Sequence, residues 1–126
     1  MTHHSNAPAN APVGYHSVTP RIVVDDVDAA VTFLRDCFDG TGDVVDGRPA
    51  EIRIGDSLIL VSDTSERAAF PALLYVYVDN ADITYQRGLA AGATSVEKPR
   101  DVPWGDRRGI LRDRQGNVFQ IAHQRT

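Results

Sequence analysis

The sequence predicts a single α+β domain built from two copies of a strand–helix–three-strand unit. The segment VDDVD at 24–28 is similar to VDNAD at 78–82, 54 positions later. The segment GDSLIL at 55–60 is similar to GNVFQI at 116–121, 61 positions later. A repeat of ~60 residues present only twice is too long and too few in copies for a solenoid. We therefore expect a duplicated βαβββ fold, in which a curved mixed sheet surrounds a concave cavity and the helices lie outside.

The composition is that of a globular protein. The chain has 126 residues, of which 42% are hydrophobic and 24% charged, and its formal net charge is −4. Negative charge argues against binding to nucleic acid or to an anionic membrane surface. No apolar run approaches the ~20 residues of a membrane-spanning helix. We therefore expect a cytoplasmic protein with no nucleic-acid or membrane partner.

The chain divides into a tail and one domain. Residues 1–13 are rich in Ala, Pro and Asn without periodicity, which predicts a disordered tail. Residues 14–126 form the domain, with one module at about 17–62 and the other at about 71–123. The polar stretch 63–69 is interpreted as the linker between them.

The first module begins with a strand at 17–24. Asp25 and Asp26 then favour the start of a helix, because short acidic side chains accept hydrogen bonds from the first backbone N–H groups. Gly40 and Gly42 are expected to end this helix. Three short strands follow at 43–46, 51–54 and 57–62, the last two joined by a hairpin turn at Gly55-Asp56.

The second module repeats this order. A strand at 73–78 precedes a helix that runs through Ala91 and is closed by Gly92. A strand at 94–98 and a loop at 99–105 come next. Two strands at 107–113 and 118–122 are joined by the turn 114–117, in which Gly116 supplies a backbone conformation of positive φ.

Alternation along the strands separates two faces of the sheet. One face is apolar and is expected under the helices: Ile22, Val24, Ile52, Ile54, Leu58, Leu60, Leu74, Val76, Val78, Phe119 and Ile121. The other face is mixed and would line the cavity: Thr19, Arg21, Glu51, Arg53, Ser57, Tyr75, Tyr77 and Gln120. A concave face that mixes polar and aromatic groups is typical of a small-molecule pocket, and bulk water on an open sheet is the alternative.

Three further features have a plain structural interpretation. Cys37, the only cysteine, is read as a buried core thiol. The interleaved arginines and aspartates of residues 100–114 are read as a solvated charged hairpin. Trp104, in a Pro-Trp-Gly loop at the expected cavity mouth, fits a ligand lid, a dimer contact or loop packing equally well.

Four stretches of the chain together resemble the vicinal oxygen chelate superfamily, which includes glyoxalase I, bleomycin-resistance proteins and extradiol dioxygenases. The stretches are TPRIVVDDVDAAVTFLRDCF, EIRIGDSLILVSD, YVYVDNADITYQRGLAAGATSVEKP and WGDRRGILRDRQGNVFQIAH. The last is similar to the family's Gly-Asp-Arg…Arg-Asp-Pro-x-Gly-Asn ending, with Arg114 where proline is usual. The resemblance implies the duplicated fold, and one scaffold of this kind carries several chemistries.

In metal-using members the resemblance places two ligands in each half. Carried over, the four positions are Thr19, Ile59, Leu73 and Gln120. Only Gln120 offers a suitable donor, whereas catalytic metals prefer imidazole or carboxylate groups. We therefore expect no cofactor and no catalytic metal, with a divalent metal as the lesser possibility.

A displaced metal site would need Glu51 together with His16 or His123. His16 precedes the first strand, and by its alternation His123 points toward the helix side. No catalytic residue is assigned.

Three functional interpretations remain. The favoured hypothesis is a bleomycin-resistance-like homodimer that binds a small aromatic or cationic molecule without a metal. The residues expected to contact the ligand are Arg21, Glu51, Arg53, Tyr75, Tyr77, Trp104 and Gln120. The alternative is a metal-dependent lyase or dioxygenase of the glyoxalase class with a non-standard site, and a cofactor-free acid–base enzyme using Glu51 or Tyr75 is a third interpretation.

Overall fold

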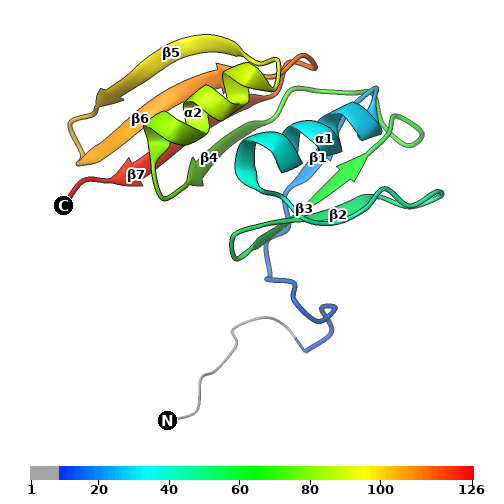
Figure 1. Cartoon of the computed structure of the whole chain (residues 1–126). Helices are drawn as coiled ribbons and strands as arrows, with labels where there is room; N and C mark the ends of the chain where they lie inside the picture. The colour runs from blue at the N-terminus through cyan, green and yellow to red at the C-terminus, as the bar shows by residue number, and fades with distance from the viewer. Residues whose placement is uncertain (1–8) are drawn as a thin grey trace.

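The computed structural model describes residues 9–126, and most of the predicted tail, residues 1–8, lies outside that range. The described chain forms two helices and seven strands in two mixed sheets (Figure 1). The α+β class and the duplicated order of elements predicted from the sequence are confirmed. The strands hydrogen-bond in two separate sheets, one from each half of the chain.

Sheet A belongs to the first half and has the order β1-β3-β2. Its strands are β1 (Arg21–Val23), β2 (Ala50–Ile54) and β3 (Ser57–Ser62). Strand β1 runs parallel to β3, and β2 runs antiparallel to it. The predicted hairpin turn joins β2 to β3, with Gly55 at φ 57°.

Helix α1 (Val27–Phe38) begins as predicted and ends differently. Asp26 is its N-cap, and the Asp26 carboxylate accepts a hydrogen bond from the Ala29 N–H at 3.0 Å. Asp39, rather than a glycine, takes the left-handed conformation that ends the helix, at φ 57°. Gly40 follows it and donates its N–H to the Leu34 carbonyl at 3.1 Å.

The strand predicted at 43–46 does not form. Thr41 makes a single antiparallel bridge to Arg53, and no strand follows it before β2. Arg35 of α1 instead donates a hydrogen bond to the Asp43 carboxylate at 3.2 Å. The first sheet therefore has one strand fewer than the second.

Sheet B belongs to the second half and has the order β4-β7-β6-β5. Its strands are β4 (Leu73–Tyr77), β5 (Thr94–Asp101), β6 (Asp106–Arg112) and β7 (Val118–Gln124). Strand β5 continues past its predicted end and through Pro99, which is tolerated because β5 is an edge strand with shifts in its pairing register.

Both helices lie on the same side of the two sheets and pack against each other (Figure 1). Helix α2 (Ala81–Ala90) covers β6 and β7. Under the contact, the ring of Phe119 on β7 lies 5.5 Å from the ring of Phe33 and 5.4 Å from that of Phe38 on α1. One core therefore serves both halves, and the opposite, polar faces of both sheets point away from the helices.

Strand β3 presents the face opposite to the predicted one. In the parallel pairs, Arg21 lies opposite Leu60 and Tyr75 lies opposite Gln120. The sequence repeat matches Arg21 with Tyr75, 54 positions later. Their partners in the two parallel pairs, Leu60 and Gln120, therefore match each other, so the offset between the hairpins is 60 rather than 61. The error comes from aligning the two hairpins at their turns, which differ in length, because a slip of one residue turns every side chain to the other face.

Burial agrees with this register. Ile59 and Val61 are 5% and 0% exposed and belong to the core, whereas Leu58 and Leu60 are half-buried and lie outside it. The prediction that Leu58 and Leu60 lie under the helices is therefore wrong.

Candidate functional site

The polar face of sheet B holds two tyrosines joined to one aspartate. The hydroxyls of Tyr75 and Tyr77 both donate to Oδ2 of Asp106, at 2.7 and 2.8 Å. Their ring centroids are 5.3 Å apart, with an interplanar angle of 54°. Asp106 is only 4% exposed, whereas Tyr75 and Tyr77 are 37% and 63% exposed. The carboxylate thus anchors an aromatic surface that is open to solvent.

Ala122 makes this arrangement possible. The tyrosines stand on β4 and Asp106 on β6, with β7 between them. Neighbouring strands are ~4.8 Å apart, so each phenol ring must cross β7 to reach the carboxylate. Tyr77 pairs with Ala122, whose methyl group is 0% exposed. A larger side chain at this position would occupy the path of the rings.

The charges of the cluster are well defined at neutral pH. The hydroxyls of Tyr75 and Tyr77 hold the pKa of Asp106 below its ordinary value, because they donate to the ionised carboxylate. The pKa of Tyr77 is raised mainly by its hydrogen bond to Asp106, and that of Tyr75 mainly by burial. Asp106 is therefore an anion and both phenols are neutral.

Gln120 lies beside this cluster. It pairs with Tyr75 on one side and with Ile110 on the other, on the polar face of β7. The structure therefore brings Tyr75, Tyr77 and Gln120 onto one face of sheet B.

The sequence interpretation missed Asp106 and Arg108. Both were read as part of a solvated hairpin, yet they are 4% and 8% exposed. The signal that could have found them is the hairpin register, because Arg108 and Ile110 pair with Ala122 and Gln120. Alternation along β6 then puts Asp106 and Arg108 on the polar face with Gln120.

Trp104 lies at the edge of the same face, in the loop between β5 and β6. It is 61% exposed, and Cζ of Arg108 lies 5.5 Å from the centre of its ring. Trp104 thus covers Arg108 and keeps most of its own surface open.

The candidate residues on sheet A are engaged by the chain itself. Arg21 donates to the Ser62 hydroxyl at 2.7 Å and pairs with Glu66 at 2.8 Å. Glu51 accepts a hydrogen bond from the Tyr15 hydroxyl and pairs with Arg48 at 3.3 Å.

Arg53 completes this group, since its guanidinium donates to the Gly14 carbonyl at 3.4 Å. None of the hydrogen bonds or ion pairs found in residues 9–126 connects Arg21, Glu51 or Arg53 to the candidates on sheet B. The predicted site is thus split into two groups.

An apolar hollow of about 260 Å³ lies between the two sheets. Its walls include Ile54 and Ile59 from sheet A and Leu74 and Val76 from sheet B, together with the two tyrosines. A larger hollow of about 550 Å³ lies at the far end of sheet A, beside Arg21. We place the candidate site at the smaller hollow, because Tyr75 and Tyr77 line it.

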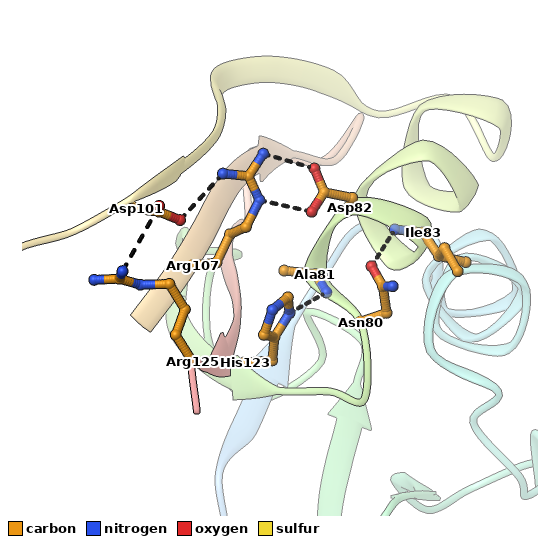
Figure 2. Close-up of polar contacts among 8 residues, drawn as sticks. All are labelled: Asn80, Ala81, Asp82, Ile83, Asp101, Arg107, His123 and Arg125. Atoms are coloured by element: carbon orange, nitrogen blue, oxygen red, sulfur yellow. Dashed lines mark hydrogen bonds and ion pairs between the residues drawn. The ribbon is translucent and has the colours of Figure 1, made fainter. Parts of the chain in front are cut away.

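His123 faces the helix side, as predicted. Figure 2 shows its ring at the N-terminus of α2, where Nδ1 accepts a hydrogen bond from the Ala81 N–H at 2.8 Å. Asn80 caps the same terminus by accepting from the Ile83 N–H at 3.1 Å. His123 therefore satisfies a free backbone donor of the helix.

Arg107 is the centre of the neighbouring ion pairs (Figure 2). It forms two hydrogen bonds with the Asp82 carboxylate, at 2.7 and 3.0 Å, and a third with Asp101 at 3.2 Å. The pKa of Asp82 is lowered chiefly by Arg107, and Arg125 lies 3.7 Å from Asp101. This network ties α2 to the ends of β5 and β6, away from the tyrosines.

The residues at the expected metal positions do not fit a metal. With the register corrected, these positions are Thr19, Leu60, Leu73 and Gln120, and two of the four carry only hydrocarbon side chains. Across residues 9–126 no group of three or more His, Cys, Asp or Glu side chains is placed to hold an ion.

Comparison with known proteins is consistent with this architecture. The sequence profile of the Glyoxalase/Bleomycin resistance protein/Dioxygenase superfamily matches residues 14–121. The chain therefore belongs to that superfamily, and the resemblance seen in its sequence is confirmed. An uncharacterized protein of Mycobacterium bovis is 29% identical, over 84% of this chain and 82% of its own length.

Solved structures of low identity share the fold. TioX from Micromonospora sp. ML1 has a TM-score of 0.75 at 24% identity and covers 85% of this chain and 97% of its own. Lactoylglutathione lyase from Agrobacterium tumefaciens has a TM-score of 0.69 at 21% identity, over 92% and 95%. Within residues 9–126, neither helix is long and apolar enough to cross a membrane.

Proposed function

We propose that this protein binds a small aromatic or cationic molecule, without a metal, on the polar face of sheet B. The observation that carries the proposal is the pair of exposed tyrosine rings fixed by Asp106. A buried carboxylate that accepts from both phenol hydroxyls favours a positive charge near the rings, and a cation over an aromatic face gains ~0.5–2 kcal/mol.

The arrangement suits binding better than acid–base catalysis. A general acid or base works best with a pKa near the operating pH. The pKa of Asp106 is lowered and that of Tyr75 is raised, so both are moved away from neutrality. The apolar hollow beside the rings supplies surface for the rest of the ligand.

Calorimetric titration with 4-methylbenzylamine tests the proposal. We expect the amine to bind more tightly than the uncharged 4-methylbenzyl alcohol and to raise the melting temperature by mass action. Tyr75→Ala should weaken amine binding at least tenfold, since it removes one ring. Tyr15→Ala, the matched control, removes a tyrosine whose hydroxyl donates to Glu51 of sheet A and should leave binding unchanged.

Two results would contradict the proposal. One is equal affinity for the amine and the alcohol, and the other is an equal loss of binding in both tyrosine variants.

We further propose that the protein works as a homodimer. Phe70 and Leu73, both 67% exposed, form an apolar surface at the start of β4, where Phe70 also bridges to Val23 of β1, and a second copy would cover this surface. In sedimentation equilibrium we expect a dimer that Leu73→Asp converts to a monomer. Val13→Asp, at a fully exposed position, should have no effect.

A further inference from the structure

The Nε of Arg108 is a hydrogen-bond donor that has no partner within residues 9–126. Arg108 follows Asp106 by two residues on the same face of β6 and is 8% exposed. Its Nη2 donates to Glu97 at 2.8 Å. Its Nε is buried and has no partner in the described chain. Because buried donors of charged groups are almost always paired, this N–H is a donor that an acceptor from outside the chain would satisfy.

The charges around Arg108 do not balance. Glu97 is the carboxylate partner of Arg108, and Arg100 lies 3.3 Å from the same carboxylate. Two guanidinium groups thus share the Glu97 carboxylate, so these three side chains together carry one net positive charge. The pKa of Glu97 is lowered, chiefly by its hydrogen bond from Arg108, so the carboxylate stays ionised. The surplus positive charge and the free N–H both favour an anionic group.

The opposite charge stands a short distance away. Asp106 is two residues along the strand, or ~6.6 Å at ~3.3 Å per residue. The two phenol rings bonded to Asp106 lie on the same face as Arg108, whose charge acts on Tyr75. Trp104 borders the positive end. The face therefore has an acidic end and a basic end, carried by residues whose Cα atoms lie ~6.6 Å apart along β6.

We propose that the ligand is amphoteric, with an aromatic ring that carries a cationic group over Tyr75 and Tyr77 and a carboxylate against Arg108. This inference rests on the proposed function, because it adds an anionic contact to the same site. The carboxylate would accept the Nε N–H in the plane of the guanidinium, the geometry that arginine favours.

A matched set of probes separates the two ends of the site. The amphoteric probe is 4-(aminomethyl)benzoate. In 4-methylbenzylamine a methyl group replaces the carboxylate, and in 4-methylbenzoate a methyl group replaces the aminomethyl group. Binding is followed by calorimetry and by the fluorescence of Trp104, the only tryptophan of the chain.

We expect 4-(aminomethyl)benzoate to bind the unmodified protein at least tenfold more tightly than 4-methylbenzylamine. Arg108→Met should abolish this advantage and leave the affinity for the amine nearly unchanged. Arg112→Met, an exposed arginine on the same face of β6, should keep the advantage. Glu97→Gln should strengthen binding of the amphoteric probe several-fold, because it removes the competing carboxylate.

The outcomes distinguish the two proposals. Equal affinity of the unmodified protein for the amphoteric probe and the amine overturns this inference and leaves the proposed function standing. Failure of the amine to bind overturns the proposed function itself. If Arg112→Met and Arg108→Met lose the affinity advantage of the amphoteric probe to the same extent, the inference is overturned, because the advantage then comes from general positive charge. Should Arg108→Met fail to fold, weaker binding in Glu97→Gln contradicts the inference independently.

Discussion

The hydroxyl of Tyr75 lies 2.7 Å from the carboxylate of Asp106, although the two residues stand on strands that are separated by a third. This contact crosses β7 on the face that carries Gln120 and Ala122. It converts two exposed phenol rings into a surface with one fixed orientation, which is the basis of the proposed site.

Enlarging Ala122 should break this contact. We expect Ala122→Leu to lower the free energy of unfolding by about 1–3 kcal/mol, because the added methylene groups overpack a site that is 0% exposed. Binding of 4-methylbenzylamine should fall with it, since the rings lose their orientation. Urea denaturation and calorimetry measure the two effects.

The matched control for Ala122 is Ala69→Leu, in the exposed linker, which should change neither quantity. Normal amine binding by the Ala122 variant would show that the path across β7 does not matter.

Asp106 should make the stability of the protein depend on pH in the acid range. Its pKa is lowered from an ordinary 3.8 by the hydroxyls of Tyr75 and Tyr77. The ionised carboxylate therefore contributes stability above about pH 3.8, and this contribution is lost as the pH falls through the lower native pKa. Asp106→Asn, which has no charge to lose, should show a flatter decline of unfolding free energy between pH 5 and pH 2.

Urea denaturation at a series of pH values measures this dependence. Asp56→Asn, at an exposed turn position, serves as the control and should follow the unmodified protein. Parallel curves for Asp106→Asn and the unmodified protein would contradict the prediction.

The register of β3 can be tested at two neighbouring positions. Ile59→Glu places a carboxylate in the core, where Ile59 is 5% exposed. It should lower the free energy of unfolding by more than about 3 kcal/mol or prevent folding. Leu60→Glu places the same group on the polar face and should cost about 1 kcal/mol. Urea denaturation followed by circular dichroism compares the stability of the two variants. A larger loss of stability in Leu60→Glu than in Ile59→Glu would support the register inferred from the sequence repeat.

Gln115 joins the two halves of the chain. Its side-chain amide accepts from the Asp26 N–H at 2.9 Å and donates to the Asp26 carbonyl at 3.0 Å. Gln115→Ala should therefore lower the free energy of unfolding by about 1 kcal/mol, in the range of exposed hydrogen bonds. Gln86→Ala, on the exposed side of α2, is the control in the same urea experiment, and equal effects would argue against the link.

Much of the fold follows from local sequence. The caps at Asp26 and Asn80, the hairpin turn at Gly55 and the duplicated order of elements depend on neighbouring residues, so the sequence alone predicts them. The placement of Tyr75 and Gln120 on one face also follows, because alternation along a strand is a local property.

Other features depend on residues far apart in the chain. The strand expected at 43–46 is absent, and Arg35 binds that segment from α1. The face of β3 depends on its pairing with β1, which the repeat could misplace by one residue because the two hairpin turns differ in length.

The site itself shows the same division. The sequence determined which strands carry aromatic and amide groups, because the order of the strands and the alternation of side chains along each strand depend on neighbouring residues. Only the tertiary structure decided that Asp106 and Arg108 are buried beside them, because burial depends on which strand lies across the sheet. The hairpin register assigns Asp106 and Arg108 to the polar face, but it does not show that phenol rings from β4 reach across that face to Asp106.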